Sequence, residues 1–447
     1  MNFDFLMGTI SKAHTRRIIF WTILFTIVNL SVKSAYILLP LFLASILTPE
    51  AYANFGVLYS LKGAMTTFSL VGLAETTVAR LKEYPSGLRR EVLFRRTSSL
   101  FIFTSLLTFL CLIPLLLYAS RTNISPWAAV FALLLGAVMS YGVLQSDFHR
   151  IEEHHKTSLV SSAGISLGAI TGLAIGGIIF QSLTLVFALG FIGASTVILF
   201  LVISGKVFVG STPRFSRVYK DSQGLLPFVG IAIFGWLSGY GMNFLIDAQF
   251  KPFYVATFTF LFTFASVSQI IVSSLNMVWA PRFYNLFNAG DSIQAESGNR
   301  FFLTILAITL GLCGNFAVAL LPWITKIIGG NLENYGHYQI ELAFLISGYV
   351  VAIPWWHGQN YYFVSGYTSD LMNLSLWSGG IGLVSWLLCM IILGPTGIFF
   401  GFPVQMAIKS GAMWFYGNQH WQLRPPWMAM AIGCLMIFSG LLTPTPY

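Results

Sequence analysis

Long apolar segments separated by short polar connections run along almost the whole chain. Residues 97–119, for example, contain no charged side chain. A helix needs about 20 apolar residues to cross the hydrocarbon core of a bilayer. The pattern therefore predicts thirteen membrane-spanning helices, at residues 18–46, 57–79, 97–119, 126–146, 157–180, 183–205, 224–248, 254–280, 301–328, 341–364, 371–393, 396–417 and 427–443.

The composition supports a membrane protein. Of 447 residues, 56% are hydrophobic and 9% are charged, whereas soluble domains average about 25% charged residues. A chain with this few charged residues cannot cover a water-exposed surface. Lipid must therefore surround most of the molecule. The apolar run that starts at Ile18 is far longer than the core of a signal peptide, roughly 7–15 residues, and we expect it to remain as the first span.

Several other classes of chemistry are not indicated. The four cysteines all lie inside apolar segments, so neither a disulfide nor a metal site is expected. No glycine-rich loop is followed by Lys-Ser or Lys-Thr, which argues against direct use of ATP. The net charge of +9 fits basic cytoplasmic loops rather than nucleic-acid binding. We expect no cofactor and no catalytic residues.

The basic residues alternate along the chain in a way that sets the topology. Cytoplasmic loops of membrane proteins carry an excess of Lys and Arg. With a cytoplasmic N-terminus, most of the 24 Lys and Arg residues fall on the cytoplasmic side, and we count Lys409 and Arg424 among them. The basic segment 206–223 then predicts a cytoplasmic linker between an N-terminal lobe (1–205) and a C-terminal lobe (224–417), followed by an extra segment (418–447).

Polar residues inside the first two spans suggest a cationic cavity. Asn29 and Lys33 share one helical face, and Lys33 lies near the bilayer centre, where a lysine costs about 2.5–3.5 kcal/mol. Lys62 and Arg80 lie on one face of the second span. Such residues are functional by default, although Lys33 could instead pair with Glu75, and Lys62 could reach the outer surface.

The C-terminal half has matching polar faces. Asn243 and Asp247 lie in the seventh span, Gln269 in the eighth and His357 in the tenth. We therefore expect a cavity built from helices of both halves. Candidate substrate-binding residues are Lys33, Lys62, Arg80, Asn29, Asp247, Asn243 and Gln269, and candidate coupling residues are Asp247, His357 and Glu75. Asp247 could instead mark a helix end, and His357 could be a structural histidine.

Several segments resemble a known family. They are Leu47–Gly56 after the first span, Ser69–Ala74 with Arg80, and Ser273–Tyr284, which ends in Pro-Arg-Phe-Tyr. These stretches are similar to the polysaccharide and O-antigen flippases (Wzx type) of the multidrug/oligosaccharidyl-lipid/polysaccharide (MOP) superfamily. The resemblance covers about residues 15–417.

The resemblance implies an all-α protein of the bacterial inner membrane, with two six-helix lobes around a central cavity. The implied substrate is an undecaprenyl-diphosphate-linked oligosaccharide, an O-antigen or exopolysaccharide unit, moved to the outer leaflet by alternating access. Lys33, Lys62 and Arg80 match the cations thought to hold its diphosphate. A polysaccharide polymerase and a chain-length regulator are implied partners. The span at 427–443 departs from the family's usual twelve or fourteen.

Other functions remain open at this point. A drug/cation antiporter of the same superfamily usually has a carboxylate in the core of its N-terminal lobe, where this first span has Lys33. A glycan polymerase or ligase usually has a large outside loop with Arg and His, and the outside loops here are short. A membrane scaffold would not need a buried cationic stripe.

Overall fold

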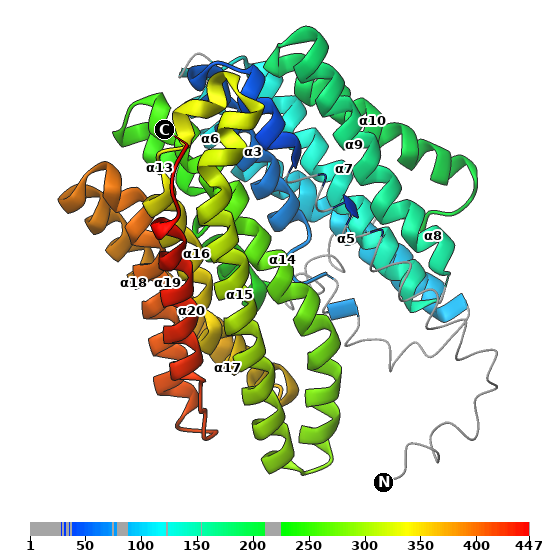
Figure 1. Cartoon of the computed structure of the whole chain (residues 1–447). Helices are drawn as coiled ribbons and strands as arrows, with labels where there is room; N and C mark the ends of the chain where they lie inside the picture. The colour runs from blue at the N-terminus through cyan, green and yellow to red at the C-terminus, as the bar shows by residue number, and fades with distance from the viewer. Residues whose placement is uncertain are drawn as a thin grey trace.

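The computed structural model describes residues 28, 31–32, 35, 38–73, 76–77, 88–121, 124–152, 154–210 and 225–446. Every element in these residues is a helix, so the predicted all-α class is confirmed (Figure 1). The α-helices are α3 (Pro49–Ser69), α5 (Leu88–Cys111), α6 (Ile113–Arg121), α7 (Pro126–Ile151), α8 (His155–Leu159), α9 (Ile165–Ile175), α10 (Leu183–Ile203), α12 (Leu226–Leu237), α13 (Met242–Gln249), α14 (Pro252–Asn288), α15 (Ser292–Ile328), α16 (Gln339–Val351), α17 (Ile353–Val364), α18 (Thr368–Leu393), α19 (Pro395–Gly417) and α20 (Trp427–Ser439).

Many of these helices can cross a bilayer. In the described part of the chain, eight helical segments are long and apolar enough to do so, or nine if the bent pair α12–α13 is one span, and Trp427–Leu442 is a shorter apolar helix. The chain is therefore a multi-pass membrane protein. The predicted span at 427–443 coincides with that shorter helix.

Glycines allow α9 and α10 to pack at very short range. Gly168 and Gly172 stand one turn apart on α9, and Gly193 lies opposite on α10. A Cβ at Gly193 would lie 2.2 Å from the carbonyl oxygen of Gly168, and one at Gly172 would lie 2.0 Å from that of Leu189. Small residues at such spacing let helix backbones approach each other in lipid, where apolar surface alone gives little driving force.

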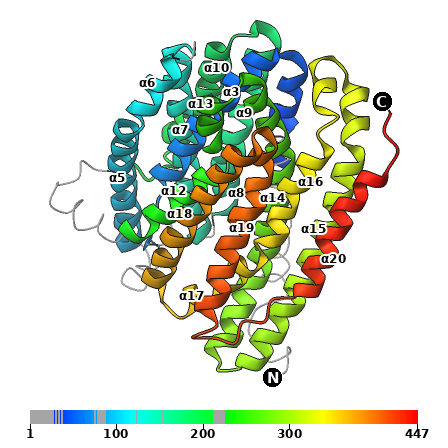
Figure 2. The ribbon, with the colours of Figure 1, turned by 90° about the vertical axis from the view of Figure 1, so that its left-hand side faces the viewer.

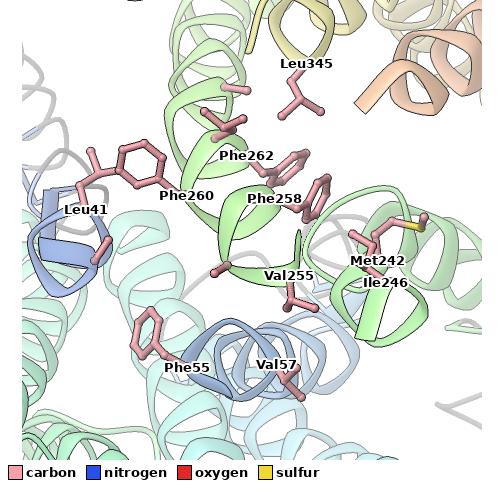
Figure 3. Packing of buried hydrophobic residues seen from close by; sticks show 14 of the residues in the cluster. Leu41, Phe55, Val57, Met242, Ile246, Val255, Phe258, Phe260, Phe262 and Leu345 are labelled. Atoms are coloured by element: carbon pink, nitrogen blue, oxygen red, sulfur yellow. The ribbon is translucent and has the colours of Figure 1, made fainter. Parts of the chain in front are cut away.

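Helix α3 joins the first half of the molecule to the second. It packs against α7 on one side and α14 on the other. Figure 3 shows Phe55 and Val57 of α3 below Val255 and Phe258 of α14, and all four side chains are buried. The contact between α3 and α14 is therefore apolar, and in lipid such a contact is stabilised mainly by close packing of the side chains.

The helices after residue 251 extend farther than predicted. Helices α14 and α15 are each 37 residues long, whereas the sequence pattern predicted spans at 254–280 and 301–328. They lie side by side and continue beyond the rest of the molecule at one end (Figures 1 and 2). The polar residues 281–300, expected as a loop, are thus largely helical. These turns are too polar to form part of an apolar run. The apolar pattern therefore ends the first of these spans too early and begins the second too late.

Several predicted spans are interrupted in the structure, and two of these interruptions lie in the second half of the chain. Predicted span 224–248 contains α12 and α13, which are bent by 45° at Ser238–Gly241. Predicted span 341–364 is divided at Ala352 into α16 and α17, with Pro354 in the first turn of α17. Proline lacks the N–H that continues a helix and favours the first turn. The predicted division into lobes remains a prediction, since 211–224 of its linker lie outside the described residues.

Candidate functional site

A cavity of about 510 Å³ lies at the broken helix pair. Small-molecule sites typically measure about 300–1,000 Å³. Helices α3, α12, α14, α16, α17, α18 and α19 all contribute to its wall. Helix α3 supplies Gly63 and Thr67, and the other described lining residues come from the second half of the chain. The predicted contribution of span one cannot be placed, because that span lies mostly outside the described residues.

The bend between α12 and α13 places backbone groups in this cavity. Ser238, Gly239 and Tyr240 form the break and line the wall. Non-helical backbone inside a membrane protein occurs where it lines a cavity or is covered by protein, and discontinuous helices often form binding sites in transporters. The break is fixed from two sides, since Trp236 Nε1 donates to the Ser60 carbonyl (3.0 Å) and Gln405 Nε2 donates to Ser238 Oγ (2.8 Å).

The walls combine aromatic rings with uncharged polar groups. Trp236, Trp355 and Trp356 present indole rings, and Gln269 and Gln359 present amides. Aromatic rings offer large rigid apolar faces, and amides can both donate and accept hydrogen bonds. This combination suits a ligand that has both apolar faces and many hydroxyl or carbonyl groups.

Lys409 of α19 is the one charged side chain in the described part of the cavity wall. It is 9% exposed, and its Nζ lies 4.9 Å from the centre of the Trp355 ring. Within the described residues no carboxylate forms an ion pair with Lys409. A buried cation without a counter-charge is costly, and the indole face offsets only part of that cost, about 0.5–2 kcal/mol.

Lys409 corrects the sequence-based charge map. The distribution of basic residues in the sequence places Lys409 among the cytoplasmic ones. In the structure it lies inside α19 and is buried. The available signal was its spacing from Gln405, one helical turn earlier, which is also buried and polar. Two polar residues on one face inside an apolar span indicate a lined cavity rather than a loop.

Of the predicted C-terminal site residues, only Gln269 lines this cavity. Asn243 is fully buried between helices: its Nδ2 donates to the Gly56 carbonyl (3.1 Å) and to Ser60 Oγ (3.1 Å), and its Oδ1 accepts from Thr259 Oγ1 (3.2 Å). These bonds link α13 to α3 and α14. A binding role for Asn243 therefore stays a prediction, while its packing role is directly visible.

Of the predicted charged residues, the structure describes Lys62 and Asp247. Lys62 of α3 is 6% exposed, and its Nζ lies 4.0 Å above the ring of Tyr59. Asp247 of α13 is partly buried and accepts a hydrogen bond from the Tyr118 hydroxyl (3.1 Å). Neither lines the cavity described above. Asn29, Lys33, Glu75 and Arg80 lie outside the described residues, and their roles stay predictions.

His357 faces away from this cavity toward α15. It is fully buried, and its Nε2 lies 3.4 Å from Oε2 of Glu296. The sequence interpretation did not include Glu296, which was expected in a loop. Because α15 begins at Ser292, Glu296 belongs to its first turns and can face another helix.

Comparison with solved structures identifies the fold. The chain has the fold of the MOP-superfamily transporters. A multidrug resistance MATE family transporter of that superfamily, in an inward-facing conformation, is 14% identical over 88% of this chain and 98% of its own, with a TM-score of 0.65. The lipid II flippase MurJ, in an inward closed conformation, is 12% identical over 94% and 91% (TM-score 0.61). A mutant of the Vibrio cholerae MATE transporter VcmN is 13% identical over 91% and 96% (TM-score 0.56).

Sequence comparison adds no closer relative. No protein-family model matches the chain, and no curated protein matches it. At identities of 12–14%, the structural likeness establishes the fold alone.

Proposed function

We propose that the protein is a flippase for undecaprenyl-diphosphate-linked oligosaccharides, units of O-antigen or exopolysaccharide. It moves them by alternating access from the cytoplasmic to the outer leaflet of the bacterial inner membrane, with its N-terminus in the cytoplasm. The observation that carries the proposal is Lys409, the single charge in the described cavity wall, surrounded by aromatic and amide side chains.

The chemistry of the cavity fits such a substrate in three respects. A diphosphate needs a cation to replace its water as it leaves solution, and Lys409 supplies one. Sugar hydroxyls need donors and acceptors, which Gln269 and Gln359 supply. The flat faces of Trp355 and Trp356 suit the apolar faces of sugar rings, while the prenyl chain remains in lipid.

The fold supports transport rather than a particular cargo. Structures of the same fold include the MurJ lipid II flippase and several MATE transporters. On this proposal a polysaccharide polymerase and a chain-length regulator would act with the protein. The chain itself would make and break no covalent bond.

The second candidate is a drug/cation antiporter, which the fold of the MATE transporters favours. A site for organic cations needs negative charge or an open aromatic face. The cavity wall, as far as the structure describes it, contains no carboxylate, and Lys409 lies over the face of Trp355. The positive charge of Lys409 therefore argues against an organic cation as the transported molecule.

A binding experiment separates the two candidates. Purified full-length protein is titrated with an undecaprenyl-diphosphate-linked oligosaccharide and, separately, with a lipophilic organic cation, while quenching of tryptophan fluorescence is followed. The flippase proposal predicts saturable quenching by the lipid-linked sugar, lost when Trp355 and Trp356 are replaced by leucine. Saturable quenching by the organic cation alone would favour the antiporter.

A further inference from the structure

A carboxylate, an imidazole and a phenol meet between α15 and α17. The Oε2 atom of Glu296 lies 3.4 Å from Nε2 of His357 and accepts a hydrogen bond from the hydroxyl of Tyr361. Its Oε1 accepts a hydrogen bond from the backbone N–H of Arg424 (3.2 Å). One carboxylate thus joins α15, α17 and the connection between α19 and α20.

The imidazole of His357 is the unusual member of this cluster. It is 0% exposed, and neither of its ring nitrogens makes a hydrogen bond to any described residue. A buried polar group without a hydrogen-bond partner is destabilising. A proton on Nε2 would convert the 3.4 Å contact with Glu296 into an ion pair and remove that defect.

Water can reach the carboxylate but not the imidazole. Glu296 lines a second cavity, of about 820 Å³, and its side chain is 21% exposed. Besides Glu296 and Tyr361, the charged or titratable groups in the described wall of this cavity are Arg300 on α15 and His420 and Arg424 on the α19–α20 connection. Of the neighbouring helices, α14 carries Tyr284, which donates to Asn360 of α17, and α19 carries Lys409, which lies over Trp355 of α17. Glu296 is the one carboxylate in the described wall of this cavity, and Arg300 and Arg424 in the same wall are cations.

Helix α17 connects this cluster to the first cavity. Its 12 residues, Ile353–Val364, carry His357 and Tyr361 toward Glu296. The same short helix carries Trp355, Trp356 and Gln359 into the wall of the first cavity. Only Ala352 interrupts the span Gln339–Val364 between α16 and α17, and Pro354 follows in the first turn of α17, so this is the point of the span where a kink is favoured.

We propose that Glu296, His357 and Tyr361 form a proton-binding site that controls the orientation of α17 and, through it, the aromatic wall of the first cavity. A proton from the second cavity draws His357 toward Glu296, and its release loosens that contact. Helix α17 is then the two-state element that both sites bias, which is the physical requirement for coupling between them. That this proton couples to substrate movement rests on the proposed function.

The first experiment follows Trp356 in the full-length protein and needs no substrate. Tryptophan is replaced by 5-fluorotryptophan, and the resonance of Trp356 is assigned by its loss in Trp356→Phe. We expect this resonance to shift reversibly as the pH is changed, and to stop shifting in Glu296→Gln and in His357→Phe.

Two control variants test whether the pH response of Trp356 depends specifically on Glu296 and His357. His420→Gln removes the imidazole that lines the described wall of the second cavity, and Glu333→Gln replaces an exposed carboxylate by an amide. Both should keep the pH response of Trp356. The proposal is overturned if the wild-type resonance does not respond to pH, if the response persists in Glu296→Gln and His357→Phe, or if only His420→Gln removes it. Glu296→Gln keeps an acceptor for Arg424 and should fold, as size-exclusion chromatography would verify.

The second experiment tests the link to transport. In proteoliposomes with an imposed pH difference, wild-type protein should move the lipid-linked oligosaccharide faster than without it, and Glu296→Gln should not respond to the pH difference. A full response in Glu296→Gln would overturn the coupling role. Absence of any transport in the wild type would contradict the proposed function instead, and the fluorine result would stand independently.

Discussion

Replacing Lys409 with methionine separates function from stability. Methionine has a similar length but no charge, so it fills the same space against Trp355. Because Lys409 is 9% exposed and no described carboxylate pairs with it, its charge has lost most of its hydration. Removing an unpaired buried charge should leave the stability unchanged or raise it.

The same change should weaken substrate binding strongly. A hydrogen bond to a charged group contributes about 1.5–3 kcal/mol, and about 1.4 kcal/mol corresponds to a tenfold change in affinity. We therefore expect Lys409→Met to bind an undecaprenyl-diphosphate-linked oligosaccharide roughly 10- to 150-fold more weakly. Tryptophan quenching measures the affinity, and thermal unfolding in detergent measures the stability.

Two matched variants accompany this test. Lys409→Arg keeps the charge and should retain most of the affinity, whereas Lys251→Met makes the same substitution at an exposed lysine and should change nothing. Unchanged affinity in Lys409→Met would refute the assignment of Lys409 to the substrate. Reduced affinity together with a large loss of stability would show that the lysine is structural.

Three other variants test the packing and the predicted first-span site. Gly193→Ala should destabilise the protein by about 1–3 kcal/mol, because its Cβ would lie 2.2 Å from the Gly168 carbonyl oxygen; thermal unfolding would show this, and Gly411→Ala, with open space around its Cβ, should be neutral or stabilising. Asn243→Leu removes the hydrogen bonds to Gly56, Ser60 and Thr259. It should lower the unfolding temperature, because a buried polar group left without its partner costs about 1–3 kcal/mol. An unchanged unfolding temperature would contradict this. Lys33→Ala should reduce export of surface polysaccharide at normal protein level, measured by glycan labelling, and full export would argue against a cationic first span.

Much of the architecture could be predicted from periodicity and charge. Long apolar runs indicate spans because every backbone polar group must be satisfied inside lipid, and α10, α18 and α19 begin and end within a few residues of the predictions. The C-terminal end of α14 and the N-terminal start of α15 could not be predicted, because the last turns of α14 and the first turns of α15 are polar and resemble a loop.

The candidate site was less accessible to sequence reasoning. The polar face of span seven predicted a cavity-lining role for Asn243, which stays a prediction, and the structure shows that Asn243 makes hydrogen bonds to α3 and α14. A polar stripe alone cannot distinguish these two uses. Glu296 and His357 are far apart in sequence, and only the packing of α15 against α17 brings them within 3.4 Å.

Transbilayer movement of the proposed substrate tests the central claim most directly. Proteoliposomes carry a fluorescent undecaprenyl-diphosphate-linked oligosaccharide in both leaflets, and a membrane-impermeant quencher is added outside. We expect wild-type protein to expose the inner pool much faster than protein-free vesicles do, and we expect Lys409→Met to slow this exposure while Lys251→Met does not. Exposure no faster than in protein-free vesicles, with active transport of an organic cation by the same preparation, would contradict it.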